Sequence, residues 1–351
     1  MRRLFICERP YPLYRTLLRA IDSDDQIDIV LGNQVDGMEQ MYNELVESEI
    51  FGNVYFFDDA TYKEFVKLTI MEHQQKPQNM FLKLKKLYLP MIRKFFSYLK
   101  LQQKAKYIKF PENLDFDSYD DIYVNDCTSS LNFYLYHKKK EVICVEHARN
   151  VFIIFNTSEV FSNVLEFLDR LHISYALRGA CRYNKAVEVS ENSKDIYKPL
   201  QKKKIIELPL EDLVGKLSDT QKERIFELYR KAYGIPGVES KVVDVVITQP
   251  LTVDGYVKNM EKQIEVYQKI IDSYSQDSDL ILVKPHPRDF ADYAKLNGNI
   301  KIVHPCVSSE ILAISQSLKI RNAITISSTS VGAFSSAENT VVLTKDYCKK
   351  V

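Results

Sequence analysis

The segment LILVKPHPRDF, residues 280–290, joins a short apolar run to side chains that can handle a phosphate group. Its first four residues are all apolar, which indicates a strand buried on both faces of a parallel sheet. Lys284, His286 and Pro287 follow at once, where ligands bind in open α/β sheets. A histidine there can neutralise a phosphate or protonate a departing one. We therefore predict His286 as a catalytic residue, and Lys284 and His286 as residues that bind the nucleotide of a donor.

A second segment of this kind is ISSTSVGAF, residues 326–334. It predicts a strand, a hydroxyl-rich turn and a helix that starts near Val331. Backbone amides at a helix start bind phosphate oxygens well, and serine hydroxyls add further donors. We predict that Ser327, Ser328 and Thr329 bind the nucleotide of a donor, although serine before a helix is also the usual N-cap.

Two more predicted strand ends carry polar groups. Gln249 follows the apolar run that begins at Val242, and His304-Pro305 follows the run IKIV. If these strands lie in one parallel sheet, their carboxyl ends meet at one edge. Gln249 is therefore a further candidate for binding, whereas His304-Pro305 is interpreted as a turn.

The elements that must position these groups alternate between strand-like and helix-like patterns, which indicates parallel sheets with crossover helices. Helices are predicted at 37–48, 158–171, 219–233 and 257–273. Strands are predicted at 2–7, 27–31, 54–57, 121–124, 141–146 and 151–155, and in a second series beginning at 242 and covering 280–283, 300–303, 322–327 and 340–344.

The two series of strands predict two Rossmann-like domains. Between them, residues 188–239 are rich in charge and contain the predicted helix 219–233, which Gly234 and Pro236 end. We place an N-terminal domain with this linker at 1–238 and a C-terminal nucleotide-binding domain at 239–351. Two such domains facing a central cleft describe the GT-B architecture.

Composition narrows the class of protein. The chain has 351 residues, a net charge of +1, 27% charged and 45% hydrophobic residues, which is typical of a globular protein and gives no sign of nucleic-acid binding. No apolar run approaches the roughly 18 residues of a membrane span, and the N-terminal apolar stretch is too short for a signal peptide. Six scattered cysteines indicate reduced thiols, so we expect a cytoplasmic protein.

Residues 80–110 contain lysines, arginine, aromatic and aliphatic residues but no acidic residue. A basic amphipathic helix can lie on an anionic membrane surface, so peripheral contact with the inner face of the cell membrane is one interpretation. The other is a helix that packs on the core with its lysines in solvent. Pro90 is expected to split the stretch into two helices.

The order of strand, KPHPR and a later strand with SSTS resembles the C-terminal half of the bacterial GT-B sialyltransferases of the lipooligosaccharide sialyltransferase and polysialyltransferase type. The opening LFICERPYPLYRTLLRAI is similar to their first strand and loop. In those families a His-Pro motif and a later Ser/Thr pair bind the CMP part of CMP-sialic acid. The resemblance assigns His286 and Pro287 to the first motif, and Ser327 with Ser328 or Thr329 to the second.

The chain departs from this resemblance at the catalytic base. The families carry an acidic pair followed by glycine after a strand of the N-terminal domain, and the carboxylate activates the acceptor hydroxyl. Here VICVEHARN, residues 142–150, places Glu146 and His147 in that position. Histidine can act as a base near neutral pH. Either His147 acts, or Glu146 acts with His147 orienting it.

The resemblance implies an inverting, metal-independent glycosyltransferase with a nucleotide-sugar donor and a glycan acceptor. It implies a sialic or related ulosonic acid from a CMP donor and a role in bacterial surface polysaccharide synthesis, with no cofactor. Asp115-Phe116-Asp117 spells the DxD of metal-dependent transferases, but its turn-like setting indicates a solvated loop. The alternatives are a GT-B transferase that uses a UDP-sugar or a CDP-polyol, and a non-catalytic scaffold of the same fold.

Overall fold

The computed structural model describes residues 1–59, 98–110, 113–125, 129–147, 152, 159–171, 179–191, 196, 198–235, 242–286 and 288–350. Contacts divide the chain into two compact units. Unit 1 comprises Met1–Tyr42 and Glu49–Leu213, and unit 2 comprises Asn43–Ser48 and Val214–Val351. The predicted division into an acceptor domain at 1–238 and a nucleotide-binding domain at 239–351 stays a prediction.

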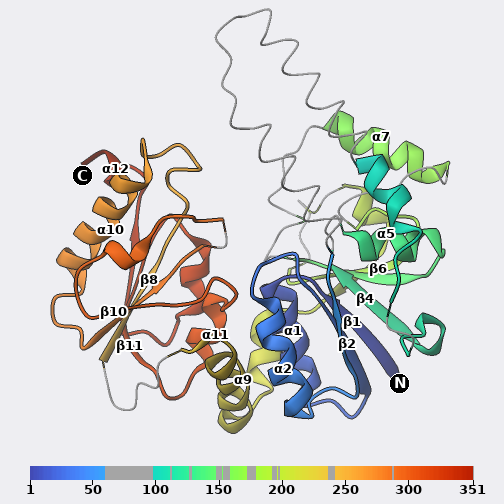
Figure 1. Cartoon of the computed structure of the whole chain (residues 1–351), viewed down its shortest axis with the longest axis horizontal. Helices are drawn as coiled ribbons and strands as arrows, with labels where there is room; N and C mark the ends of the chain where they lie inside the picture. The colour runs from blue at the N-terminus through green and yellow to red at the C-terminus, as the bar shows by residue number, and fades with distance from the viewer. Residues whose placement is uncertain are drawn as a thin grey trace, which may run out of the picture. The chain divides into compact units, whose positions relative to one another are not determined.

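Unit 1 is built on a seven-stranded parallel sheet of order β3-β2-β1-β4-β5-β6-β7 (Figure 1). The order reverses between β1 and β4, which is the point where such sheets bind ligands. The strands are β1 (Arg2–Cys7), β2 (Gln26–Gly32), β3 (Val54–Phe57), β4 (Asp121–Asn125), β5 (Val142–Val145), β6 (Asn184–Val189) and β7 (Lys204–Glu207).

The helices of unit 1 follow strands, as the parallel topology requires. Helix α1 (Pro10–Ala20) begins with a proline at its first position, where the fixed φ angle of proline favours a helix start, and it packs on β1. The others are α5 (Ser130–His137) and α7 (Glu159–Arg170), with 3₁₀ turns η1 (Phe116–Ser118) and η2 (Lys198–Lys202). Helices α2 (Met38–Ser48) and α8 (Leu210–Gly215) each contribute residues to both units.

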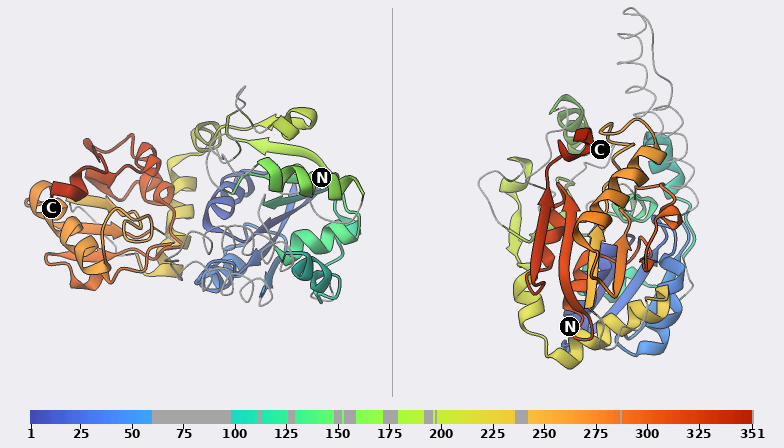
Figure 2. Two further views of the ribbon diagram at one scale, coloured as in Figure 1. Left: turned by 90° about the horizontal axis from the view of Figure 1, so that it is seen from above. Right: turned by 90° about the vertical axis from the view of Figure 1, so that its left-hand side faces the viewer.

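Unit 2 contains a five-stranded parallel sheet of order β10-β9-β8-β11-β12. Helix α10 packs on it through Val266, Tyr267 and Ile270, which share a core with strand residues, and Figure 2 shows this helix beside the strands. The strands are β8 (Val242–Ile247), β9 (Leu280–Lys284), β10 (Ile300–Ile302), β11 (Lys319–Ile326) and β12 (Asn339–Leu343). The helices are α9 (Asp219–Tyr233), α10 (Met260–Tyr274), α11 (Ser309–Ile314) and α12 (Tyr347–Lys350), with η3 (Tyr293–Lys295) and η4 (Thr329–Ala333).

The sequence explains the ends of α9. Ser218 and Gln221 form a reciprocal capping box at its start, which satisfies amide groups that have no partner within the helix. Gly234 ends the helix with a φ of 62°, in the left-handed region that favours glycine. The predicted helix 219–233 is confirmed residue for residue.

Each sheet carries a buried ion pair toward the amino ends of its strands. Asp28 of β2 accepts a hydrogen bond from Arg2 Nη2 at 2.9 Å. Asp244 of β8 accepts two from Arg321 of β11, from Nε at 3.1 Å and from Nη2 at 2.7 Å. Both carboxylates are fully buried, so each is stabilised by its arginine rather than by water.

Most predicted strands are present, but the linker prediction is wrong for part of 188–239. Residues 184–189 and 204–207 form β6 and β7, which extend the sheet of unit 1, and the predicted strand 141–146 is shorter, at Val142–Val145. Strand β7 was not predicted because it is short and has a charged residue at each end, with two half-buried isoleucines between them. The predicted strand 151–155 lies outside the described residues except for Phe152.

Candidate active site

The loop after β9 fixes the tautomer and the charge of the His286 ring. Its Nδ1 accepts a hydrogen bond from the backbone N–H of Arg288 at 3.0 Å, so the neutral ring carries its proton on Nε2. Burial, followed by the positive charges of Arg288 and Lys284, lowers the pKa of His286 to about 4. At neutral pH the ring is therefore an uncharged hydrogen-bond donor.

A hydrogen-bond network beneath this loop explains the Arg-Asp pair after the histidine. Asp289 accepts hydrogen bonds from the Thr248 hydroxyl at 2.7 Å, from the Tyr293 hydroxyl at 2.5 Å and from Gln263 Nε2 at 2.8 Å. Thr248 Oγ1 in turn accepts from the backbone N–H of His286 at 3.2 Å. Asp289 thus ties the histidine loop to the end of β8. Thr248 stands at a strand end that the sequence singled out but was not among the predicted binding residues, and Asp289 was given no role.

Arg288 points to a further acidic group. Its guanidinium lies 3.6 Å from the carboxylate of Asp254, in the loop after β8. Asp254 was also missed, and its place in a turn before the α10 helix gave no signal.

Lys284 lies under the site. It is 4% exposed, and its ammonium donates to the carbonyls of Pro285 at 2.5 Å and Pro305 at 3.3 Å. Burial lowers its pKa to about 8. The lysine joins the loops that follow β9 and β10, and its predicted contact with the donor stays a prediction.

The strand register brings three predicted residues to one level of the sheet edge. Ile247 of β8 is paired with Lys284 of β9 and with Thr325 of β11. Gln249, His286 and Ser327 each lie two residues beyond that line, at the carboxyl ends of neighbouring strands. The sheet order also reverses between β8 and β11, so these residues stand at the position where open α/β sheets commonly bind ligands.

The hydroxyl-rich turn differs from its prediction in one respect. The helix expected near Val331 is the five-residue 3₁₀ turn η4, because Ser328 caps the N–H of Ser330 and the turn ends at Ala333. A turn this short has little dipole, so the hydroxyls rather than a helix start remain to meet a phosphate. Ser327 is exposed with a φ of 51°, and Thr329 opens the turn.

Two further residues, Gln249 and Pro287, were predicted to bind the donor nucleotide. Gln249 is half-buried, and its Nε2 donates to the carbonyl of Thr248 at 3.1 Å. Its backbone N–H donates to the Tyr267 hydroxyl at 2.6 Å. Pro287 lies outside the described residues.

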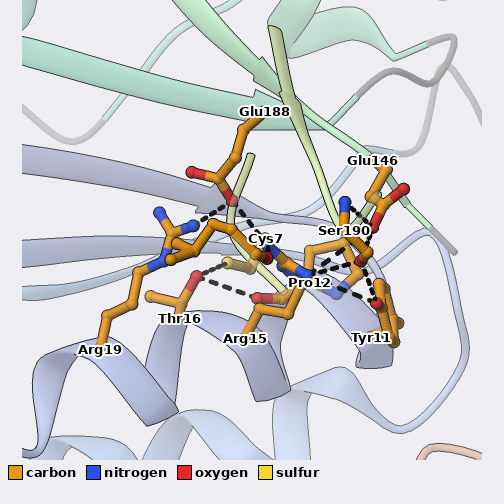
Figure 3. Close-up of polar contacts among 10 residues, drawn as sticks. Cys7, Tyr11, Pro12, Arg15, Thr16, Arg19, Glu146, Glu188 and Ser190 are labelled. Atoms are coloured by element: carbon orange, nitrogen blue, oxygen red, sulfur yellow. Dashed lines mark hydrogen bonds and ion pairs between the residues drawn. The ribbon is translucent and has the colours of Figure 1, made fainter. Parts of the chain in front are cut away.

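In unit 1, Glu146 and His147 follow β5 as predicted, and Figure 3 shows the polar contacts of Glu146. Glu146 is 1% exposed, and its Oε1 accepts hydrogen bonds from the backbone N–H of Ser190, at 2.9 Å, and from the Ser190 hydroxyl. Arg15 Nη1 lies 3.6 Å from the same oxygen. His147 is half-buried.

Arg15 and Ser190 belong to a cluster that sequence analysis missed. Arg15 donates to Ser190 Oγ and to Glu188 Oε1, both at 2.9 Å, and Arg19 pairs with the same glutamate. The Tyr11 hydroxyl lies 3.2 Å from Ser190 Oγ, and burial raises the pKa of Tyr11. The available signal was an arginine among the apolar residues of the helix PYPLYRTLLRA.

Two other segments singled out in the sequence are Asp115–Asp117 and the basic stretch 80–110. Asp115 caps the N–H of Asp117, and Asp117 is exposed and pairs with Lys140, as expected of a solvated loop. Within the described ranges, no group of three or more His, Cys, Asp or Glu side chains is arranged to hold a metal ion. Of the basic stretch 80–110, only 98–110 is described, and Tyr98, Leu101 and Ala105 pack in a core cluster.

A family model matches most of the chain. The model of glycosyltransferase family 52 matches residues 79–345. A protein of Haemophilus influenzae without a described function is 32% identical over 140 residues, which cover 38% of this chain and 42% of that protein.

One solved structure supports the fold assignment. An α/β-galactoside α-2,3-sialyltransferase from Photobacterium phosphoreum is similar with a TM-score of 0.50 and 11% identity, over 97% of this chain and 90% of that one. A UDP-GlcNAc 2-epimerase from Methanocaldococcus jannaschii aligns with a TM-score of 0.42 and 14% identity, over 100% and 91% of the two chains. The predicted GT-B class and the resemblance to bacterial sialyltransferases are confirmed, and the chain belongs to glycosyltransferase family 52.

Proposed function

We propose that this protein is an inverting glycosyltransferase that transfers a sialic or related ulosonic acid from a CMP-activated donor to a glycan acceptor. The observation that carries the proposal is the shared level of Gln249, His286 and Ser327 at the reversal point of the second sheet. A nucleotide phosphate placed there meets an imidazole N–H and a hydroxyl at once. Family membership supports the transfer chemistry.

The leaving group is stabilised by hydrogen bonding in this proposal. The neutral ring of His286 donates its Nε2 proton in a hydrogen bond to the phosphate oxygen as the bond to the anomeric carbon breaks. Ser327 supplies a hydroxyl to the same phosphate. The other residues that we propose to contact the donor are Gln249, Lys284, Pro287, Ser328 and Thr329. No step calls on a metal ion or cofactor.

The acceptor is activated from unit 1. We assign the base to His147 because Glu146 is buried and already accepts two hydrogen bonds from Ser190. His147 takes the proton of the acceptor hydroxyl, and the oxygen forms a bond to the anomeric carbon while CMP departs. A single displacement of this kind inverts the anomeric configuration.

The proposed setting is the synthesis of bacterial surface polysaccharide in the cytoplasm, at the inner face of the cell membrane. None of the helices in the described ranges is long and apolar enough to cross a membrane. Contact with the membrane through 80–110 is part of the proposal, and the described end of that segment packs in the core.

Nucleotide binding tests this function directly. Calorimetry with CMP, UDP and CDP should give tightest binding for CMP, and His286→Ala should lose it. The matched control is His304→Ala, which removes the other histidine that precedes a proline; His304 stacks on Tyr233 with ring centroids 4.7 Å apart. Preference for UDP or CDP would move the assignment to the alternative transferases, and no nucleotide binding would favour a scaffold.

A further inference from the structure

Arg15 is a charged residue in a position where burial carries a large desolvation penalty. Helix α1 packs on β1, and Arg15 is 1% exposed between the buried Tyr14 and Thr16. Burying an arginine costs several kcal/mol unless its charge is well compensated, and apolar replacements of buried ion pairs are often neutral or stabilising. Packing alone therefore does not account for an arginine here.

Its contacts run toward one place, the carboxyl ends of β5 and β6. Nη1 donates to Ser190 Oγ, and Nη2 donates to Glu188 and to the carbonyl of Leu208, each at 2.9 Å. Ser190 passes the connection on, because both its N–H and its hydroxyl donate to Glu146. The side chains form one connected chain from α1 to the residue before His147 (Figure 3).

The charges within this set are balanced. Arg15 and Arg19 face Glu146 and Glu188, and all four side chains are nearly or wholly buried. Removing Arg15 would leave Arg19 as the one cation of the set, beside the two buried carboxylates of Glu146 and Glu188. The two carboxylates would then repel each other, and the end of β5 would shift.

We propose that Arg15 is a positioning residue for transfer: it holds Glu146 through Ser190, and so fixes the turn from which His147 acts. This inference rests on the proposed function, in which His147 is the base. Arg15 touches neither substrate nor the reacting atoms. It acts on the rate because a base displaced by about 1 Å can lose on the order of 100-fold in turnover.

The test compares four variants in transfer from CMP-sialic acid. Arg15→Met should lower kcat on the order of 100-fold, with the KM for the donor nearly unchanged because the donor binds unit 2. Arg15→Lys should recover part of kcat, since the ammonium keeps the charge but not the four contacts. Arg2→Met is the control, because it removes the charged partner of the buried Asp28 at the opposite end of the same sheet and should lower the melting temperature alone.

A double variant separates position from charge balance. Arg15→Met with Glu188→Gln restores one cation to one carboxylate, so it should regain melting temperature while kcat stays low. The proposal is overturned if the double variant regains kcat, if Arg15→Met keeps kcat close to that of the wild type, or if Arg2→Met lowers kcat equally.

A measurement without turnover keeps this proposal apart from the proposed function. If the wild-type protein transfers no sialic acid, the proposed function fails, and Arg15 is judged by NMR of histidine-labelled protein. The ring resonance of His147 should move in Arg15→Met and stay in place in Arg2→Met. A His147 resonance that is equal in both variants would refute the positioning role.

Discussion

The hydroxyl of Thr248 donates a hydrogen bond to the carboxylate of Asp289 at 2.7 Å, and this contact fastens the histidine loop to the neighbouring strand end. Thr248 also accepts the backbone N–H of His286 at 3.2 Å. The position of the candidate phosphate ligand thus depends on one buried threonine.

Thr248→Val should therefore weaken CMP binding about tenfold, which corresponds to the roughly 1.4 kcal/mol of one or two lost hydrogen bonds. Valine keeps the shape but can neither donate to Asp289 nor accept from His286. Calorimetry measures the affinity. Ser278→Ala, which removes a hydroxyl that bonds to Leu280 at the other end of β9, is the control and should leave CMP binding as it was. Equal affinity in wild type and Thr248→Val would show that the loop holds without this contact.

Arg321→Met should lower the free energy of unfolding by about 3 kcal/mol, because it leaves the Asp244 carboxylate buried without its charged partner. Urea denaturation gives the value. Lys262→Met is the control, since its pair with Glu265 is exposed and such pairs contribute about 1 kcal/mol or less. A loss no greater than that of the control would mean that the pair at Asp244 adds little to stability.

Stability should fall between pH 6.5 and pH 4 in a way that depends on His286. Its pKa is lowered to about 4 in the folded protein, so in this range the unfolded chain binds a proton that the folded chain does not. The contribution is complete above pH 6.5 and is lost as the pH falls toward 4. Denaturation at several pH values should show a steeper decline for the wild type than for His286→Asn. Parallel curves would contradict the lowered pKa.

Gly234→Ala should destabilise the protein by about 1 kcal/mol, because alanine is strained at a φ of 62° even though the space around the glycine is open. Gly215→Ala, at the end of α8, has equally open space and no positive φ, and should be neutral or slightly stabilising. Thermal denaturation of both variants compares backbone strain with simple loss of glycine. Equal melting temperatures would exclude strain at Gly234.

The sequence predicted well those elements whose structure depends only on neighbouring residues in the chain. The apolar run at Leu280 and the capped helix from Asp219 each follow from local chemistry, and the structure has both. Strand β7 was hidden because it is a short edge strand of only four residues, and its terminal lysine and glutamate are typical of a charged linker.

The candidate site was less predictable than the fold. The strand ends identified His286, Gln249 and Ser327, because a parallel sheet gathers such ends at one edge. Asp289 and Arg15 could not be found in this way, since their partners lie 41 and 175 residues away in the chain. Only the folded chain shows that the histidine loop and the β5 turn each depend on a distant side chain.

The two ion pairs at the amino ends of the sheets have a consequence for engineering. Asp28 with Arg2 and Asp244 with Arg321 stabilise strands whose opposite ends bear the candidate chemistry. Libraries that vary Gln249 and Ser327 would leave those anchors intact, so many members should still fold. Because the stabilising ion pair and the candidate binding residues lie at opposite ends of its strands, the second sheet is a suitable scaffold for selecting transferases with altered donor preference.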